Sequence, residues 1–140
     1  MCRLSVNVCG CGGSDPGGDC LVCADPCGAY VVVDFAGEWP FRLINVHAPN
    51  DELARKIFLN RVFGFVNDAT IVIGDFNITL SKLDVGRNNV YRNDGSRTLL
   101  LNLLHRHGLV EVWRALNLTR RGFSRRQVKY VLQLAPMLLQ

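Results

Sequence analysis

Residues 70–77 join an apolar run to two polar side chains that can do chemistry. The β-branched run 70–73, closed by Gly74, is typical of a strand buried on both faces. Asp75 and Asn77 follow it, and alternate residues of an extended chain point to the same side. The carboxylate can accept a proton from water or bind a metal ion, and the carboxamide can donate to an anionic oxygen. In the alternative interpretation, both side chains only satisfy the backbone groups of a turn.

A second polar pair ends the strand predicted before this one. Residues 40–48 alternate apolar and polar side chains, as a strand with one buried face does, and the pattern breaks at Pro49. Asn45 and His47 lie on the polar side near its end. A single histidine on a strand is usually a solvated or structural residue. Two strands that both end in polar groups favour a shared site instead.

The order and spacing of these motifs resemble the middle of an endonuclease/exonuclease/phosphatase domain. The matching segments are Asn-Val-His-Ala-Pro-Asn at 45–50, a helix, Gly-Asp-Phe-Asn at 74–77, and residues 109–114 and 123–124. Within that superfamily the chain is most similar to the apurinic-endonuclease-like nuclease of LINE-type non-LTR retrotransposons. The resemblance covers residues 30–126 and implies an α+β fold, namely part of a β-sandwich with outer helices.

The resemblance implies a metal-dependent phosphodiesterase, a DNA endonuclease that uses Mg²⁺ to neutralise charge on the scissile phosphate. In that scheme Asp75 prepares the attacking water as general base, and Asn77 donates to the phosphate. His47 stands where many members carry a phenol. An imidazole donates best when it is protonated, so this substitution would add a pH dependence.

The resemblance also implies residues that contact the substrate, and the charge distribution agrees with DNA as the partner. Substrate-binding roles fall on Asn45, Asn50, Ser124 and Arg125. Residues 1–81 hold 5 Lys and Arg against 9 Asp and Glu, whereas residues 82–140 hold 11 against 3. A basic half suits a phosphate backbone, and the alternative is an Arg-rich surface that is only solvated. Lipid or inositol phosphatase activity is the rival within the superfamily.

Three parts of the family's catalytic site have no counterpart in this sequence. Residues 1–29 contain no Glu, whereas the family's metal-binding Glu precedes the hairpin. Residues 126–132 stand where an Arg-Ile-Asp-Tyr-like strand is expected, and no Ser-Asp-His follows. If Lys129 takes the position of that Asp, a cation replaces an acceptor. We therefore expect a fragment with impaired catalysis, because the members of such a site act together. The alternative is a non-catalytic, basic nucleic-acid-binding remnant.

All six cysteines lie in the first 27 residues. One interpretation is a zinc site, with Cys20, Cys23 and Cys27 as candidate ligands, and another is disulfide pairing in a secreted chain. The Gly-rich segment between the cysteines specifies no geometry. We expect residues 1–28 to be a disordered Cys/Gly-rich extension, with a small zinc-binding module as the alternative.

One α+β domain is predicted over residues 29–132, followed by an apolar tail over residues 133–140. It begins with a hairpin whose strands are residues 30–35 and 41–47. A helix then leads to the central strand described above. The unpaired strand edges of a partial sandwich would invite association with another chain.

Two helices are predicted beside these strands. The first is capped by Asn50 or Asp51. Its apolar face comprises Leu53, Ile57, Phe58, Phe63 and Phe65. The second helix, at residues 97–107, is capped by Ser96. It buries Leu99, Leu100, Leu103 and Leu104. Residues 109–114 and 122–124 are predicted as short extended pieces.

Length and composition exclude some classes of protein. The 140 residues are 49% hydrophobic, enough for one domain with a core, which argues against disorder throughout the chain. Residues 1–9 lack the apolar region of a secretory signal, and no apolar run is long enough to cross a membrane. We therefore expect an intracellular chain, and the resemblance implies the nucleus.

Overall fold

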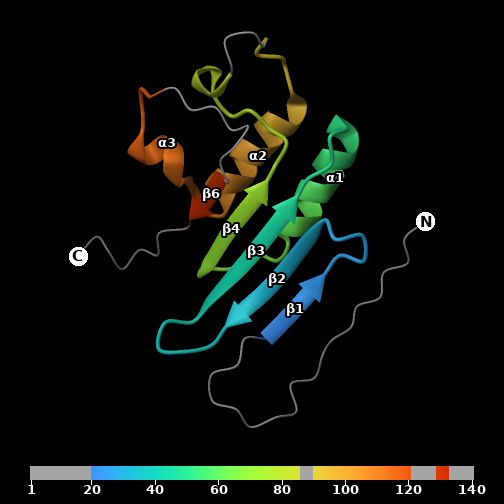
Figure 1. The fold of residues 1–140 in the computed structure, drawn as a ribbon, viewed down its shortest axis with the longest axis vertical. Coiled ribbons are helices and arrows are strands. Elements are labelled where there is room, and N and C mark those ends of the chain that lie inside the picture. The colour runs from blue at the N-terminus through green and yellow to red at the C-terminus, as the bar shows by residue number, and fades with distance from the viewer. Residues whose placement is uncertain (1–19, 86–89, 121–128, 133–140) are drawn as a thin grey trace.

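The computed structural model describes residues 20–85, 90–120 and 129–132. Within these ranges six strands form one mixed sheet in the order β1-β2-β3-β4-β6-β5 (Figure 1). The strands are β1 (Cys20–Ala24), β2 (Tyr30–Phe35), β3 (Phe41–His47), β4 (Thr70–Asp75), β5 (Val110–Glu111) and β6 (Lys129–Leu132). The helices are α1 (Glu52–Phe63), the short 3-10 helix η1 (Lys82–Asp84), α2 (Gly95–Arg106) and α3 (Val112–Leu116). The architecture is α+β, as the sequence predicted.

The predicted hairpin is confirmed as β2 and β3, which pair antiparallel with Phe35 opposite Phe41. Their rings stack with centroids 4.5 Å apart, which ties the two strands together next to the turn. After α1 the chain enters β4, which pairs with β3 in parallel. Because the pair is parallel, both strands end at the same edge of the sheet.

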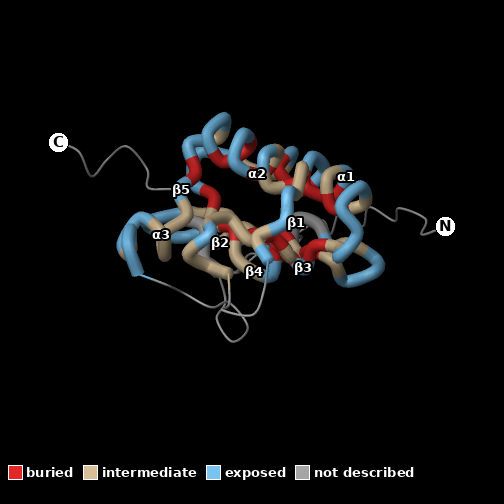
Figure 2. The backbone as a smooth tube through the Cα atoms, turned by 90° about the horizontal axis from the view of Figure 1, so that it is seen from above, coloured by how far each residue is buried: buried red, intermediate tan, exposed pale blue. Residues whose placement is uncertain are grey.

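Helices α1 and α2 lie side by side over one face of the sheet (Figure 2). On that face the strand residues Val32, Ile44 and Val72 are fully buried. They share one hydrophobic core with the helix residues Phe58, Leu59, Val62, Phe63, Leu100, Leu103 and Leu104. Each such side chain stabilises the fold by roughly 1.5–3 kcal/mol relative to full exposure, so this layer holds α1 and α2 on the sheet.

The opposite face of the sheet presents the alternate residues of the same strands. Here Val31, Val33, Leu43, Ile71 and Ile73 are partly exposed. The resemblance implies part of a two-sheet sandwich, and the residues that the structure describes build one of its sheets with α1 and α2 on one side.

The predicted apolar face of α1 is partly wrong. The helix begins after Asp51, whose carboxylate accepts a hydrogen bond from Ala54 N–H at 2.8 Å, as the sequence suggested. However, Leu53 and Ile57 are 68% and 64% exposed, whereas Arg55 is only 5% exposed. A guanidinium occupies a position in the buried stripe where the sequence pattern calls for an apolar side chain. Its partners are described with the site below.

Helix α2 starts two residues earlier than predicted. Asp94 caps it, accepting from Ser96 N–H at 2.9 Å, so Ser96 is not the cap. Ser96 is instead completely buried in the first turn. Of the predicted stripe, Leu100, Leu103 and Leu104 are buried, whereas Leu99 is only partly buried. Asp and Ser are both good N-caps, so the sequence alone does not separate them.

The segment after β5 is helical rather than extended. Residues 112–116 form α3, because the Glu111 carboxylate accepts from Arg114 N–H at 3.0 Å and caps a single turn. The other predicted extended piece, residues 122–124, lies outside the described residues. No helix in the described ranges is long and apolar enough to cross a membrane.

The extension predicted over residues 1–28 is ordered from Cys20 onward. Strand β1 pairs antiparallel with β2 and contains a bulge. This pairing satisfies backbone groups that the outer edge of β2 would otherwise expose, a gain that composition alone does not reveal. β1 and β5 are the two outer strands of the sheet. Residues 1–19 and the predicted apolar tail at 133–140 lie outside the described part of the chain.

Candidate functional site

The ends of β3 and β4 bring two of the predicted site residues next to each other. In the parallel register His47 is level with Asp75, and Asn45 is level with Ile73. Just beyond, Ala48 N–H donates to the Asp75 carbonyl at 2.8 Å and extends the pairing by one bond. The side chains of Asn45, His47 and Asp75 are exposed. The structure therefore presents an imidazole and a carboxylate at one edge of the sheet.

A tight turn follows Asp75 and fixes its carboxylate. Asn77 N–H donates to Asp75 Oδ1 at 2.9 Å, and Asn77 Nδ2 donates to the Ala48 carbonyl at 2.6 Å. Asn77 has a φ of 51°, a left-handed conformation that asparagine tolerates well. Both side chains thus bond to backbone groups, as the turn interpretation expected. These bonds engage one carboxylate oxygen of Asp75 and one amide hydrogen of Asn77. The second oxygen and the second hydrogen are left to contact a ligand, in an orientation that the turn fixes.

Gly74 allows β4 to approach β3 closely just before the site. Its φ is 124°, and a Cβ placed on it would lie 2.0 Å from the Val46 carbonyl oxygen and 2.7 Å from Val46 N. No side chain fits at those distances, so the position requires glycine. The glycine of the Gly-Asp-Phe-Asn motif therefore has a structural role in setting the register of the site.

Arg55 connects the loop after β3 to the start of α2. Its Nε donates to Ser96 Oγ at 2.7 Å, and its Nη2 donates to Asp94 Oδ2 at 2.8 Å. Its Nη1 donates to the carbonyls of Pro49 at 3.1 Å and Asn50 at 2.7 Å. The planar fork of a guanidinium suits such a set of diverging acceptors. Arg55 thereby places Asn50, whose side chain is exposed beside the site.

Sequence reasoning missed Arg55 and Asp94. A polar signal was present, because Asp-Gly-Ser precedes the apolar stripe of α2 and is a typical helix start. However, Arg55, which pairs with Asp94, is 39 residues away in the chain and lies on a different helix. Pairing between such distant residues cannot be read from local patterns.

The pKa of Asp94 lies below its ordinary value. Partial burial acts to raise it, but two hydrogen bonds from Ser96 and the charge and hydrogen bond of Arg55 outweigh that effect. The carboxylate is therefore ionised at neutral pH, and the Arg55–Asp94 contact is an ion pair.

Acid is expected to weaken the fold through Asp94. Because the folded-state pKa is lowered, this group stabilises the fold above its unfolded pKa of about 3.9 and ceases to do so as the pH falls through the folded-state value. The difference in free energy of unfolding between wild type and Asp94→Asn, measured with urea, should hold from pH 7 to 5 and shrink toward pH 2. A difference that stays constant to pH 2 would contradict this. Asp68→Asn, at an exposed position, is the matched control.

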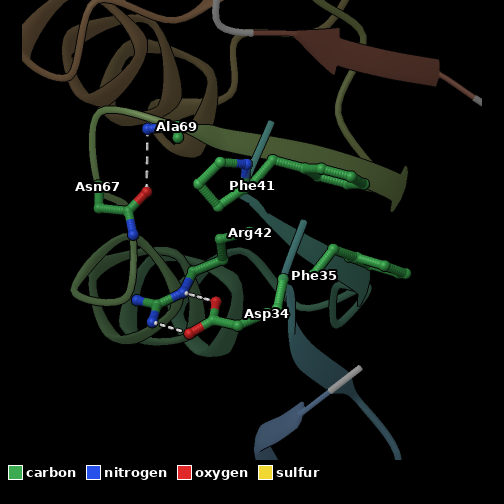
Figure 3. A pocket seen from close by; sticks show the side chains of 8 residues that line it. Asp34, Phe35, Phe41, Arg42, Asn67 and Ala69 are labelled. Carbon is green, nitrogen blue, oxygen red and sulfur yellow. Dashed lines mark hydrogen bonds and ion pairs between the residues drawn. The ribbon is translucent and has the colours of Figure 1, made fainter. Parts of the chain in front are cut away.

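A pocket of about 400 Å³ lies at the other ends of β3 and β4 (Figure 3). Phe35, Phe41 and Arg42 are among the residues that line it. The Arg42 guanidinium donates twice to Asp34, at 2.7 and 2.8 Å, and a third time to the Phe65 carbonyl. The hydrogen bond from Arg42 lowers the pKa of Asp34. Arg42 and Asp34 neutralise each other, so we assign the pocket a structural role. It lies at the opposite end of β4 from Asp75.

Comparison with solved structures shows the fold. The structure is similar to that described as "Endonuclease domain of TRAS1, a telomere-specific non-LTR retrotransposon", with a TM-score of 0.53 and 16% identity. The similarity covers 88% of this chain and 58% of that domain. This chain has the fold of a retrotransposon endonuclease domain. The resemblance inferred from its motifs is confirmed at that level.

Sequence comparison points to the same class of element. Over 82 residues the chain is 34% identical to "Transposon TX1 uncharacterized 149 kDa protein" of Xenopus laevis. The alignment spans 55% of this chain and 6% of that protein. No family model matches the chain. Two independent comparisons, one of structure and one of sequence, thus lead to transposable elements.

Strand β6 lies beside β4 on the side away from β3 (Figure 1). The pairing is antiparallel and sets Lys129 level with Gly74, one residue before Asp75. The family resemblance predicted a strand at residues 126–132, with Lys129 as the residue at the position of an Asp. The described part of that segment, residues 129–132, does pair with β4, and the assignment of Lys129 to the Asp position stays a prediction.

The described residues do not form a complete metal site by themselves, although Asp75 could contribute one ligand. Among them, no group of three or more His, Cys, Asp or Glu side chains could hold one. Cys20 and Cys23 lie on β1, and Cys27 is exposed in the turn that follows. Zinc binding by these cysteines stays a prediction, as do the roles of Ser124 and Arg125, which lie outside the described ranges.

Proposed function

We propose that this endonuclease-fold domain binds nucleic acid and acts on a phosphodiester at the ends of β3 and β4. One observation carries the proposal, namely that His47 and Asp75 are neighbours in register at the edge where both strands end. The TRAS1 domain of the same fold is described as an endonuclease, which makes DNA the substrate we favour. The surplus of Lys and Arg over Asp and Glu in residues 82–140 suits such a polyanion.

In this proposal Asp75 orients the attacking water. Its Oδ1 is held by Asn77 N–H, and the second oxygen accepts the water proton as the water oxygen bonds to phosphorus. The P–O bond to one strand end breaks in the same step, and the leaving oxygen takes a proton from solvent. A ring N–H of His47 donates to a phosphate oxygen, and the second amide hydrogen of Asn77 donates to another. Asn45 and Asn50 contact the strand on either side. These groups position the phosphodiester relative to the attacking water, and such positioning can supply a large share of the rate enhancement.

We further propose that catalysis by these residues is slow and that binding dominates. The resemblance implies Mg²⁺, but the described residues provide no cluster of ligands for it. The resemblance expects an acceptor in the strand next to β4, and the sequence offers Lys129 in that strand. A non-catalytic nucleic-acid-binding domain is therefore the second candidate function, and the surplus of Lys and Arg over Asp and Glu in residues 82–140 favours it.

Nicking of supercoiled plasmid separates these two functions. We expect slow nicking with Mg²⁺ and none with EDTA, and Asp75→Ala should reduce nicking to the EDTA background. Asp68→Ala removes an exposed carboxylate just before β4, at the other end of the strand, and should leave nicking unchanged. Equal nicking by the two variants would show that Asp75 has no role. Plasmid binding without nicking by wild type would establish the non-catalytic function.

A further inference from the structure

The connection between β4 and α2 gathers cations around one tyrosine. The Arg97 guanidinium carbon lies 4.0 Å from the Tyr91 ring centroid, and Lys82 Nζ lies 6.0 Å from it. Cations are attracted to the face of an aromatic ring at these distances. The Tyr91 hydroxyl donates to the Leu80 carbonyl at 3.4 Å, which holds the ring against the chain leaving β4.

Arg97 also fixes the two ends of this connection. Its Nε donates to the Thr79 carbonyl at 2.6 Å, and its Nη2 donates to the Arg92 carbonyl at 2.8 Å. These bonds are made to neutral carbonyls, so they fix the position of Arg97 without neutralising its charge. A preorganised cation loses less entropy when it binds an anion.

No carboxylate neutralises this cluster within the described part of the chain. The ion pairs found there engage Arg42, Arg55, Lys56, Arg61 and Arg114. Asp84, the acidic residue nearest to Lys82 in the sequence, pairs with Arg114. Lys82 in η1, Arg92 just before α2 and Arg97 in the first turn of α2 form a cluster of three positively charged residues, none of which is in these ion pairs. Such like charges repel one another, and a polyanion would relieve that repulsion.

The cluster lies close to the candidate site. Thr79 is two residues after Asn77, so their Cα atoms are at most about 7 Å apart. Arg97 is bonded directly to Thr79 and thus lies within reach of a strand that passes Asp75. Lys82 and Arg92 are exposed and able to meet a ligand.

We propose that Lys82, Arg92 and Arg97 clamp the backbone phosphates of a nucleic acid strand beside the phosphodiester held at Asp75. Tyr91 positions the Arg97 guanidinium on its ring and supports the clamp. The proposal rests on the proposed function for its orientation, but the binding it describes does not require cleavage. Phosphate contacts of this kind are independent of sequence and sensitive to salt.

The test is the salt dependence of binding to a labelled DNA duplex in EDTA, where cleavage does not interfere. Lys82→Gln and Arg92→Gln should each weaken binding several-fold and lower the slope of log affinity against log salt by about 0.9. Arg106→Gln removes the same charge from an exposed position at the far end of α2 and should leave the slope unchanged. Both clamp variants change exposed side chains, and thermal unfolding verifies that they fold.

Two outcomes would overturn the clamp. The first is a salt slope for both clamp variants equal to that of wild type. The second is a loss of affinity for poly-glutamate but not for DNA, which would make the partner an acidic polypeptide. The two proposals can fail separately. If wild type does not nick DNA but Lys82→Gln and Arg92→Gln still weaken DNA binding, the proposed catalytic function fails and the clamp stands.

Discussion

Gly74→Ala is expected to cost about 3 kcal/mol or more of unfolding free energy. The added Cβ would lie 2.0 Å from the Val46 carbonyl oxygen, a backbone atom of a strand that is paired on both sides. Neither strand can move without breaking the register that sets His47 beside Asp75. Urea unfolding followed by circular dichroism measures the loss.

Gly108→Ala is the matched control for the backbone conformation alone. Gly108 has a φ of 63°, and a Cβ there would meet nothing within 4 Å. Its replacement should cost only about 1–2 kcal/mol, the usual penalty for an L-residue in the left-handed region. If the two variants lose the same free energy, the contact with Val46 is not the cause.

Arg55→Leu is expected to destabilise the domain by about 3 kcal/mol, since it leaves a partly buried carboxylate and several backbone carbonyls without their partner. The change removes hydrogen bonds to Asp94 and Ser96 and to the Pro49 and Asn50 carbonyls. Arg55→Lys should recover only part of the loss, because an ammonium cannot reproduce the fork. Urea unfolding of both variants provides the measurement.

Lys56→Leu, at the next residue of α1, gives the comparison. Lys56 forms an exposed ion pair with Glu52, and such pairs contribute about 0–1 kcal/mol. A loss at Arg55 no larger than the loss at Lys56 would show that the network is not important for stability. A double-mutant cycle of Arg55→Leu with Asp94→Asn would give the coupling between the partners.

The strands and the site were predictable because their signals are local. Alternation predicted residues 41–47, and a β-branched run followed by Gly74 predicted β4. Asp75 and His47 were identifiable because polar groups at the ends of two strands are unusual. The shared site was expected because both strands end in polar groups, and the parallel pairing that makes His47 and Asp75 neighbours was found in the structure.

The remaining features depend on contacts between residues distant in sequence. Periodicity assigned Leu53 and Ile57 to the core, yet the buried stripe of α1 includes Arg55 because Asp94 and Ser96 receive its hydrogen bonds. The cluster around Tyr91 likewise depends on contacts that bring Lys82 and Arg97 to its ring from different segments of the chain. Local patterns cannot show which charged residues will find partners.

The placement of β6 between β4 and β5 determines when the sheet can be completed. The ribosome adds 54 residues between Asp75 and Lys129. At 5–20 residues per second this takes roughly 3–11 s. During that interval one edge of β4, an apolar strand beside the candidate site, has no strand to pair with. The nascent chain is therefore most prone to aggregation between the synthesis of β4 and that of β6, which makes this the period in which a chaperone would matter most.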